Sequence, residues 1–385
     1  MMPLAPPNPQ GYPIPFWMLE ALKVLGFSLH AAPMNLWYAG MPVAVLLGLL
    51  GGANARRLAG RLGKVMPIAV ALGVNFGVIP LLFTQVVNYQ FFYTAGVLIA
   101  WPWLSVIPLL IVAYYGVYLH AESRRRTLAL ASGAASAVML VVIGFLFANN
   151  FTLMTNLPQW LAIFRRTAMA GSPTGLALNL GDVTVLPRWL MMFGLAITTT
   201  AAYIALDTAF FAPREPQYRR WTAWFALRLY SLGLVWFAAT GSWYFFGALS
   251  GQVHEAMLAR PAVMALMAAT AVAPGLPWLL IILWRRLSGA RLAALIGAAQ
   301  FGVIAVNAIS RQWVQNVELG RYADLARVPV RPQWTALAGF LVAMGAATWL
   351  VVWMVVRLRA GWAAGEQQIT PTATSSQPGS AASSQ

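Results

Sequence analysis

The sequence predicts an all-α integral membrane protein, a polytopic bundle of about nine transmembrane helices. Of its 385 residues, 60% are hydrophobic and only 9% are charged, whereas about 25% of the residues of a soluble domain are charged. One run, from Met66 to Ala121, contains no Asp, Glu, Lys or Arg. Because a membrane-spanning helix needs about 20 mostly apolar residues, this run is long enough for two spans and a tight turn.

Similar apolar windows recur along the rest of the chain. A Pro-rich and interfacial arm, residues 1–23, precedes them. The tail, 358–385, is rich in Ser, Thr, Pro and Gly, so we expect it to be disordered. The transmembrane bundle then occupies residues 24–357. Its expected spans are 24–51, 66–88, 92–120, 128–150, 187–211, 221–249, 261–284, 292–313 and 335–357.

The basic residues predict the orientation of the bundle. Fifteen of the 25 Lys and Arg residues fall after spans one, three, five, seven and nine, and eight fall on the opposite side. Cytoplasmic loops carry the excess of Lys and Arg. We therefore expect the N-terminus outside and the C-terminus in the cytoplasm, as an odd number of spans requires.

Two segments on the expected outer side, 151–186 and 314–334, are longer than simple turns. The first contains the sequence PQWLAIFRR, residues 158–166. Its apolar side chains can lie against lipid while Arg165 and Arg166 reach the headgroups. This pattern predicts a helix that lies at the membrane surface.

The composition also limits the chemistry of the protein. The chain has no Cys, which excludes disulfides, iron–sulfur clusters and covalently attached haem on this chain. A redox centre would therefore need His or Met ligands. The formal charge of +16 comes from short basic clusters between apolar spans, so membrane topology explains it, and we expect lipid and not nucleic acid as the partner.

His30 is expected in the outer half of the first span, whereas His120 falls at the cytoplasmic end of the third span and His254 in a short outer loop. An ionisable side chain within a membrane is costly, which suggests a function. Neutral imidazole is a common haem ligand. The alternative is a histidine that only hydrogen-bonds a neighbouring helix.

Three further polar residues, Gln85, Asn88 and Tyr89, fall at the outer end of the second span. Hydrocarbon offers them no hydrogen-bond partner, so they should face other helices or a bound group. We expect them to line an outer-leaflet site together with His30.

Asp207 and Arg228 are charged residues within spans five and six, near the same face of the membrane. A structural ion pair across this helical hairpin is the favoured interpretation, because pairing removes the cost of a lone charge. Proton uptake from the cytoplasm is the alternative function for the two residues.

Two stretches of the sequence resemble the first subunit of cytochrome bd quinol oxidases. One is FSLHAAPMNLWYAG in the first span, which is similar to the family's segment around a haem-ligating histidine. The other is LGVNFGVIPLLFTQVVNYQFFYTAGVLIAWPWLSVIPLLIV, which matches the layout of the family's second and third helices. The helix count and the outside N-terminus agree with the family as well.

The resemblance implies that His30 holds one b-type haem. Other family features are missing: the fifth span has no histidine, the third has no acidic residue, and the loop between spans six and seven has shrunk to about residues 250–260. A complete oxygen-reducing oxidase is therefore not expected. The resemblance points instead to bacterial bd-like proteins of the inner membrane that accompany multihaem c-type cytochromes.

The sequence thus predicts a subunit of a respiratory electron-transfer complex that interacts with quinol and passes electrons to a periplasmic cytochrome. Two alternatives remain open. One is a cofactor-free anchor that docks a periplasmic cytochrome through the segments 151–186 and 314–334. The other is a small-molecule transporter, which the absence of a visible internal repeat disfavours.

Overall fold

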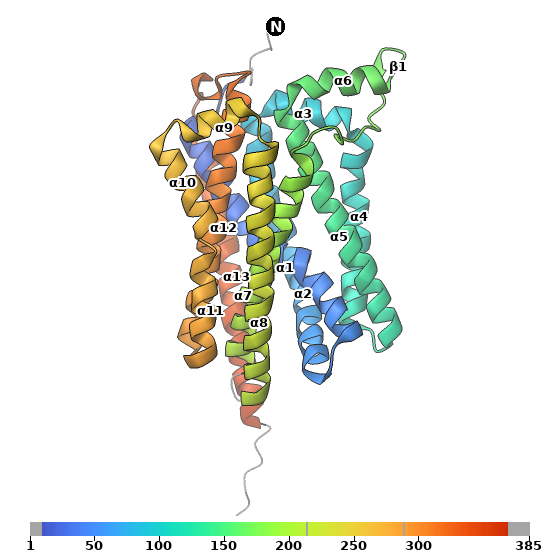
Figure 1. Cartoon of the computed structure of the whole chain (residues 1–385), viewed down its shortest axis with the longest axis vertical. Coiled ribbons are helices and arrows are strands. Elements are labelled where there is room, and N and C mark those ends of the chain that lie inside the picture. The colour runs from blue at the N-terminus through green and yellow to red at the C-terminus, as the bar shows by residue number, and fades with distance from the viewer. Residues whose placement is uncertain (1–9, 213–214, 288, 369–385) are drawn as a thin grey trace, which may run out of the picture. The chain divides into compact units, whose positions relative to one another are not determined.

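The computed structural model of the chain describes the backbone of residues 10–212, 215–287 and 289–368, and the side chains as far as residue 357. It contains two compact units, Met1–Val330 and Arg331–Gln385. The first unit is a bundle of long helices (Figure 1). The second contains the last helix and is described by itself.

Long helices make up almost all of the first unit. In its first half, α5 leads into a surface helix and a two-residue hairpin with the register Ala168↔Pro173. The elements of this half are α1 (Phe16–Leu50), α2 (Ala53–Val87), α3 (Tyr89–Leu98), α4 (Ala100–Glu122), α5 (Arg126–Thr155), α6 (Leu157–Thr167), β1 (Ala168–Met169) and β2 (Ser172–Pro173).

The second half of the chain continues the bundle. Its elements are α7 (Val185–Phe211), α8 (Pro216–Ser242), the π-helix η1 (Trp243–Ala248), α9 (Gly251–Leu258), α10 (Pro261–Val272), α11 (Gly275–Leu287), α12 (Ala290–Gly320), the 3-10 helix η2 (Leu325–Arg327) and α13 (Trp334–Gln368). The last of these, α13, belongs to the second unit.

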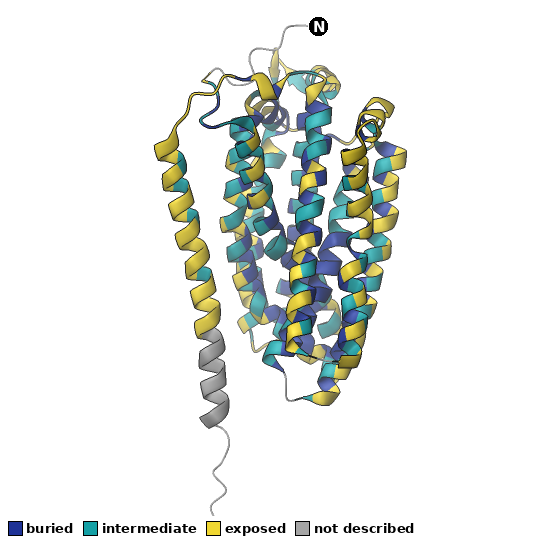
Figure 2. Ribbon diagram, turned by 90° about the vertical axis from the view of Figure 1, so that its left-hand side faces the viewer, coloured by how far each residue is buried: buried dark blue, intermediate teal, exposed yellow. Residues whose placement is uncertain are grey.

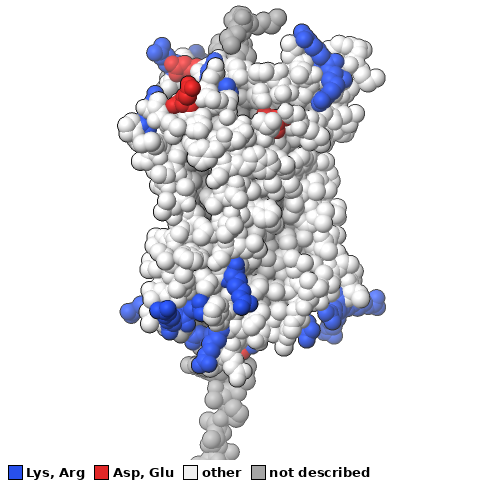
Figure 3. Space-filling view, in the orientation of Figure 1, with Lys and Arg blue, Asp and Glu red and all other residues white. Residues whose placement is uncertain are grey.

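Nine helical segments in the described residues are long and apolar enough to cross a membrane. This confirms the predicted all-α polytopic fold. On the face seen in Figure 3, basic side chains lie near the upper and lower ends and the middle is almost free of charge. An uncharged middle is what a hydrocarbon layer requires.

Several boundaries differ from the sequence prediction. The first helix begins at Phe16 and not at residue 24, so residues 16–23 of the predicted arm form its first turns. A break at Asn88 separates α2 from α3, and a break at Ile99 separates α3 from α4, so the predicted third span begins inside α3. Ala273 and Pro274 form the break between α10 and α11. At the C-terminus, α13 continues to Gln368, and the remainder of the predicted tail, 369–385, lies outside the described residues, as do residues 1–9.

The arm that precedes α1 is partly fixed to the bundle. The backbone N–H of Tyr12 donates to the carbonyl of Pro329 at 2.8 Å. Its hydroxyl donates to the carbonyl of Val87 at 3.2 Å, and the ring is fully buried. This arm therefore ties the end of α2 to the segment that follows α12. The tie lies at the upper end of Figure 1, where α3, α6 and α9 are also found.

The core of the bundle is built mainly from α1, α2, α7 and α8, with further buried residues from α4, α5, α11 and α12. Buried residues are dark blue in Figure 2. The most extensive helix contacts are those of α1 with α2 and of α7 with α8. Small residues let membrane helices approach closely. At Gly194 on α7 an added Cβ would lie 2.7 Å from the backbone nitrogen of Phe237 on α8. The contact between these two helices therefore depends on glycine.

We predict that Gly194→Val destabilises the protein by about 1–3 kcal/mol, since overpacking a tight contact costs this much. The measurement is thermal unfolding of the purified protein in detergent. Gly302→Val is the matched control, because a Cβ at Gly302 meets nothing within 4 Å. Equal unfolding temperatures for the two variants would contradict the close approach of α7 and α8.

Candidate functional site

His30 lies in the seam between α1 and α2. Its Nδ1 is 2.7 Å from the carbonyl oxygen of Gly73. A carbonyl can only accept, so Nδ1 carries the proton and donates it. The neutral ring then has a lone pair on Nε2, which makes no hydrogen bond within the described residues. This is the tautomer in which histidines ligate metals through Nε2.

The sequence around His30 provides space for its ring. A Cβ on Gly77 would lie 2.9 Å from ring atoms of His30, so glycine on α2 is what lets the imidazole fit. The rings of Phe27 and Trp37 have their centroids 6.3 and 6.4 Å from that of His30. The imidazole is thus held between a glycine face of α2 and two aromatic side chains of its own helix.

Arg311 of α12 lies beside this group. Its guanidinium carbon is 4.4 Å from the ring centroid of Phe27 on α1 and 5.2 Å from that of Phe151 on α5. The neighbouring residues Ser310 and Gln312 are buried, yet Arg311 is exposed. It forms no salt bridge within the described residues. An accessible cation therefore lies where α1, α5 and α12 meet.

Two amide side chains at the upper end of α5 and in the loop beyond it are unsatisfied. Asn150 is fully buried, and both polar atoms of its amide have no partner among the described residues. The same holds for the side-chain amide of Asn179, whose backbone N–H donates to Asn149 at 2.9 Å. Buried amides are normally hydrogen-bonded. The upper half of the bundle thus has polar groups that its own side chains do not satisfy.

A groove of about 660 Å³ runs between α1 and α12 at the upper end. Most of its wall is apolar, with Phe16, Val24, Phe301, Ile309 and Trp313 among the lining residues. Its ionisable lining residue is Glu20, which accepts a hydrogen bond from Gln312 at 3.0 Å, and Asn316 also lines the groove. Pockets for small organic ligands are built in this way, from apolar walls and a few polar groups.

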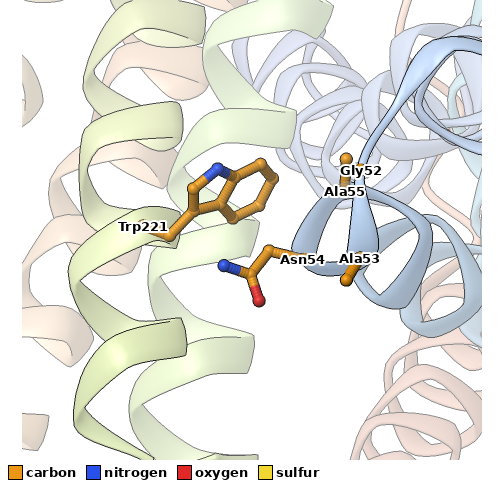
Figure 4. A pocket seen from close by; sticks show the side chains of 5 residues that line it. All are labelled: Gly52, Ala53, Asn54, Ala55 and Trp221. Atoms are coloured by element: carbon orange, nitrogen blue, oxygen red, sulfur yellow. The ribbon is translucent and has the colours of Figure 1, made fainter.

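A second cavity, of about 260 Å³, lies at the lower end of the bundle. Figure 4 shows the indole of Trp221 on α8 and the amide of Asn54 on α2 facing each other across it. It has no ionisable group among its lining residues. We regard the groove beside Glu20 as the better candidate site.

The structure does not unite the predicted site residues in one place. His30 contacts α2 at Gly73 and Gly77, whereas Asn88 is 11 residues further along the chain, about 16 Å at 1.5 Å per helical residue. Tyr89 is 45% exposed and packs on Tyr93, and Gln85 is half-buried. Asn88 is buried with its amide nitrogen unpaired, so it remains a candidate apart from His30.

The predicted pair of Asp207 and Arg228 is not the one that forms. Asp207 accepts two hydrogen bonds from Arg61 of α2, at 2.7 and 2.9 Å. Arg228 instead lies over the ring of Trp224, with 5.7 Å between its guanidinium carbon and the centroid. The prediction was wrong because it considered only the hairpin of α7 and α8. The partner comes from a third helix.

The same region contains a second cross-helix ion pair, between Arg57 of α2 and Glu215. The guanidinium carbon of Arg57 also lies 4.3 Å from the ring centroid of Tyr218 on α8. The hydrogen bond from Arg57 lowers the pKa of Glu215. Two arginines one turn apart on α2 thus fasten it to the α7–α8 hairpin at the lower end.

The upper end has a buried ion pair that the sequence analysis did not anticipate. Arg188 of α7 pairs with Glu318 of α12, and its Nε donates to the hydroxyl of Tyr244 at 2.9 Å. Tyr244 lies in the π-helix η1. The three residues come from segments that are far apart in the sequence, so no local pattern could have indicated the cluster.

His30 is the residue that could hold a b-type haem, because its Nε2 has no hydrogen bond within the described residues and imidazole is a common haem ligand. The rings of Phe27 and Trp37 lie beside it, and Arg311 contacts Phe27. Neither of the two cavities described above is lined by His30. No cluster of three or more His, Asp or Glu residues in the described part of the chain resembles a site for a bare metal ion.

Comparison with solved structures finds the same fold in a bd oxidase from Geobacillus thermodenitrificans. The TM-score is 0.63, and the match covers 91% of this chain and 98% of the other at 12% sequence identity. The bd-like fold that the resemblance implied is therefore confirmed. No family model matches the chain. No curated protein matches it either.

We predict energetic coupling between Arg61 and Asp207. Breaking a buried pair leaves one charge uncompensated and costs about 3–5 kcal/mol, so Asp207→Asn and Arg61→Gln should each lower the unfolding temperature. In a double-mutant cycle their effects should be non-additive by at least about 1 kcal/mol. The matched cycle of Asp207→Asn with Arg228→Gln should be additive. Coupling to Arg228 and none to Arg61 would contradict the observed pairing.

Proposed function

We propose that the chain is the membrane subunit of a bacterial respiratory electron-transfer complex, which takes electrons from quinol and carries one b-type haem on His30. The observation that carries the proposal is the imidazole of His30. Its Nδ1 is fixed by the carbonyl of Gly73 and its Nε2 is left for a ligand. A bound haem supplies a one-electron acceptor within the bundle.

Arg311 supports this assignment. Its guanidinium group contacts Phe27, whose ring lies beside that of His30. A guanidinium binds carboxylates through paired hydrogen bonds. We assign it the role of holding the haem carboxylates, while Phe27 and Phe151 exclude water from the same place.

The groove between α1 and α12 is the proposed quinol site. Oxidation of a quinol releases two protons and two electrons, so the site needs a proton acceptor. Glu20 is a carboxylate at the polar end of an otherwise apolar groove. Gln312 and Asn316 are placed to hold the quinol hydroxyls. The apolar wall suits the isoprenoid side of such a substrate.

The order of these parts along α1 suggests a path for electrons. Glu20 precedes His30 by ten residues, about 15 Å along one helix. Both lie toward the upper end of the bundle, which the charge distribution predicts to be periplasmic. Electrons would therefore leave to a periplasmic cytochrome, and Asn88 would lie on that side as a further polar contact.

A cofactor-free anchor is the second candidate function. It is favoured by the same hydrogen bond, since Gly73 already satisfies one nitrogen of His30 without any ligand. The segments for docking a partner would then be 151–186 and 314–334. The two functions differ in whether Nε2 of His30 binds a haem or remains without a ligand.

We predict that the purified protein shows a b-type signal in a reduced-minus-oxidised absorption spectrum, and that His30→Ala loses it. His120→Ala is the matched control, because Nδ1 of His120 is likewise 2.7 Å from a carbonyl, that of Ala129. It should keep the haem. If the wild-type protein is purified together with its partners and contains no haem, the redox role is excluded and the anchor function is favoured.

We predict that Glu20→Gln slows quinol oxidation by about 10²- to 10⁴-fold, the usual contribution of a general base. The substitution keeps the shape of the side chain and removes its proton-accepting charge. The measurement is the rate of quinol-dependent haem reduction in the purified complex. Glu255→Gln, an exposed acid on α9, is the control and should match wild type. An unchanged rate in Glu20→Gln would place quinol elsewhere.

A further inference from the structure

The lower ends of α8 and α11 present an arrangement that the proposed function does not use. The exposed indole of Trp224 on α8 contacts two arginines. The guanidinium carbon of Arg285 on α11 lies 3.3 Å from the ring centroid, and that of Arg228 lies 5.7 Å from it. Trp224 is 50% exposed and Arg228 is exposed as well. Two cations therefore share one aromatic side chain on the surface of the bundle.

These two cations have no acidic partner among the described residues. Asp207 and Glu215, the carboxylates of the α7–α8 hairpin at this end, are bound by Arg61 and Arg57. Figure 3 shows basic side chains gathered over the lower ends of these helices. Both guanidinium groups lie against the same indole, and like charges repel each other, more strongly in low-dielectric surroundings. An anion placed against both guanidinium groups would remove this cost.

The depth of the pair in the membrane indicates which anion can reach it. The span Pro216–Ala248 has 33 residues, about 50 Å at 1.5 Å per residue, whereas the hydrocarbon core is about 30 Å thick. If the span is centred in the bilayer, about 10 Å of it lies outside the hydrocarbon core at each end. Trp224 is eight residues after Pro216, about 12 Å along the helix. Trp224 is thus at the boundary where tryptophans and lipid headgroups meet.

We propose that Trp224, Arg228 and Arg285 form a binding site for the phosphate of an anionic membrane phospholipid. Basic pockets between transmembrane helices bind such headgroups. Each guanidinium can give two parallel hydrogen bonds to phosphate oxygens. The indole holds both groups in place by cation–π contact, and the acyl chains would lie along the apolar outer faces of α8 and α11.

The test is a lipid titration of the full chain in uncharged detergent, followed by native mass spectrometry. Phosphatidylglycerol should bind to the wild type, and phosphatidylcholine should bind more weakly. The double variant Arg228→Gln with Arg285→Gln should bind phosphatidylglycerol at least about tenfold more weakly, because hydrogen bonds to charged groups are the strong ones. The difference should shrink in high salt.

Two further variants isolate the cause. Arg228→Lys with Arg285→Lys keeps the charge and should retain much of the binding, which separates loss of charge from loss of folding. Arg165→Gln with Arg166→Gln removes two exposed arginines of α6 at the other end and should bind like wild type. Equal affinity for the two lipids, or full binding by the double glutamine variant, would overturn the proposal. The result is independent of haem content.

Discussion

The structure depends on one constraint: a polar side chain inside a span must find its partner on another helix, because hydrocarbon offers none. His30 meets this constraint through the carbonyl of Gly73, and the space for its ring exists only because α2 has glycine at position 77. This contact fixes the rotation of α1 against α2. It also leaves one ring nitrogen for chemistry.

The same constraint organises both ends of the bundle. At the lower end Arg57 and Arg61 bind carboxylates of the α7–α8 hairpin, and at the upper end Arg188 and Glu318 join α7 to α12. Between these clamps the helices are held mostly by small and apolar residues, as at the contact of Gly194 with α8. The open space in the upper half is the groove between α1 and α12.

Much of the fold could be predicted from the sequence, since the length and apolar content of a segment decide whether it can span a membrane. The position of His30 within the first span followed from the length and apolar content of that segment. The breaks at Asn88 and Ile99 were missed because α3 is as apolar as the spans on either side. The start of α1 was missed because Glu20 and Lys23 suggested a surface, whereas both are paired with residues of α12.

The candidate site could be predicted only in part. A single sequence indicates which residues are costly in lipid but not which helices are neighbours. Asp207 was recognised and given the wrong partner. A regular spacing of Arg57 and Arg61, one turn apart, was the available sign that α2 presents a basic face. Glu20 and Gln312 are separated by 292 residues, so no local pattern connects them, and the groove between α1 and α12 emerged only in three dimensions.

The central proposal is that Nε2 of His30 would bind the iron of a b-type haem. Pulsed electron paramagnetic resonance on the oxidised protein, purified with ¹⁵N-labelled histidine, tests it most directly. The account predicts a hyperfine coupling from one directly bound imidazole nitrogen, present in His120→Ala and absent in His30→Ala. A haem that shows no such coupling, or one whose coupling survives the loss of His30, would contradict it.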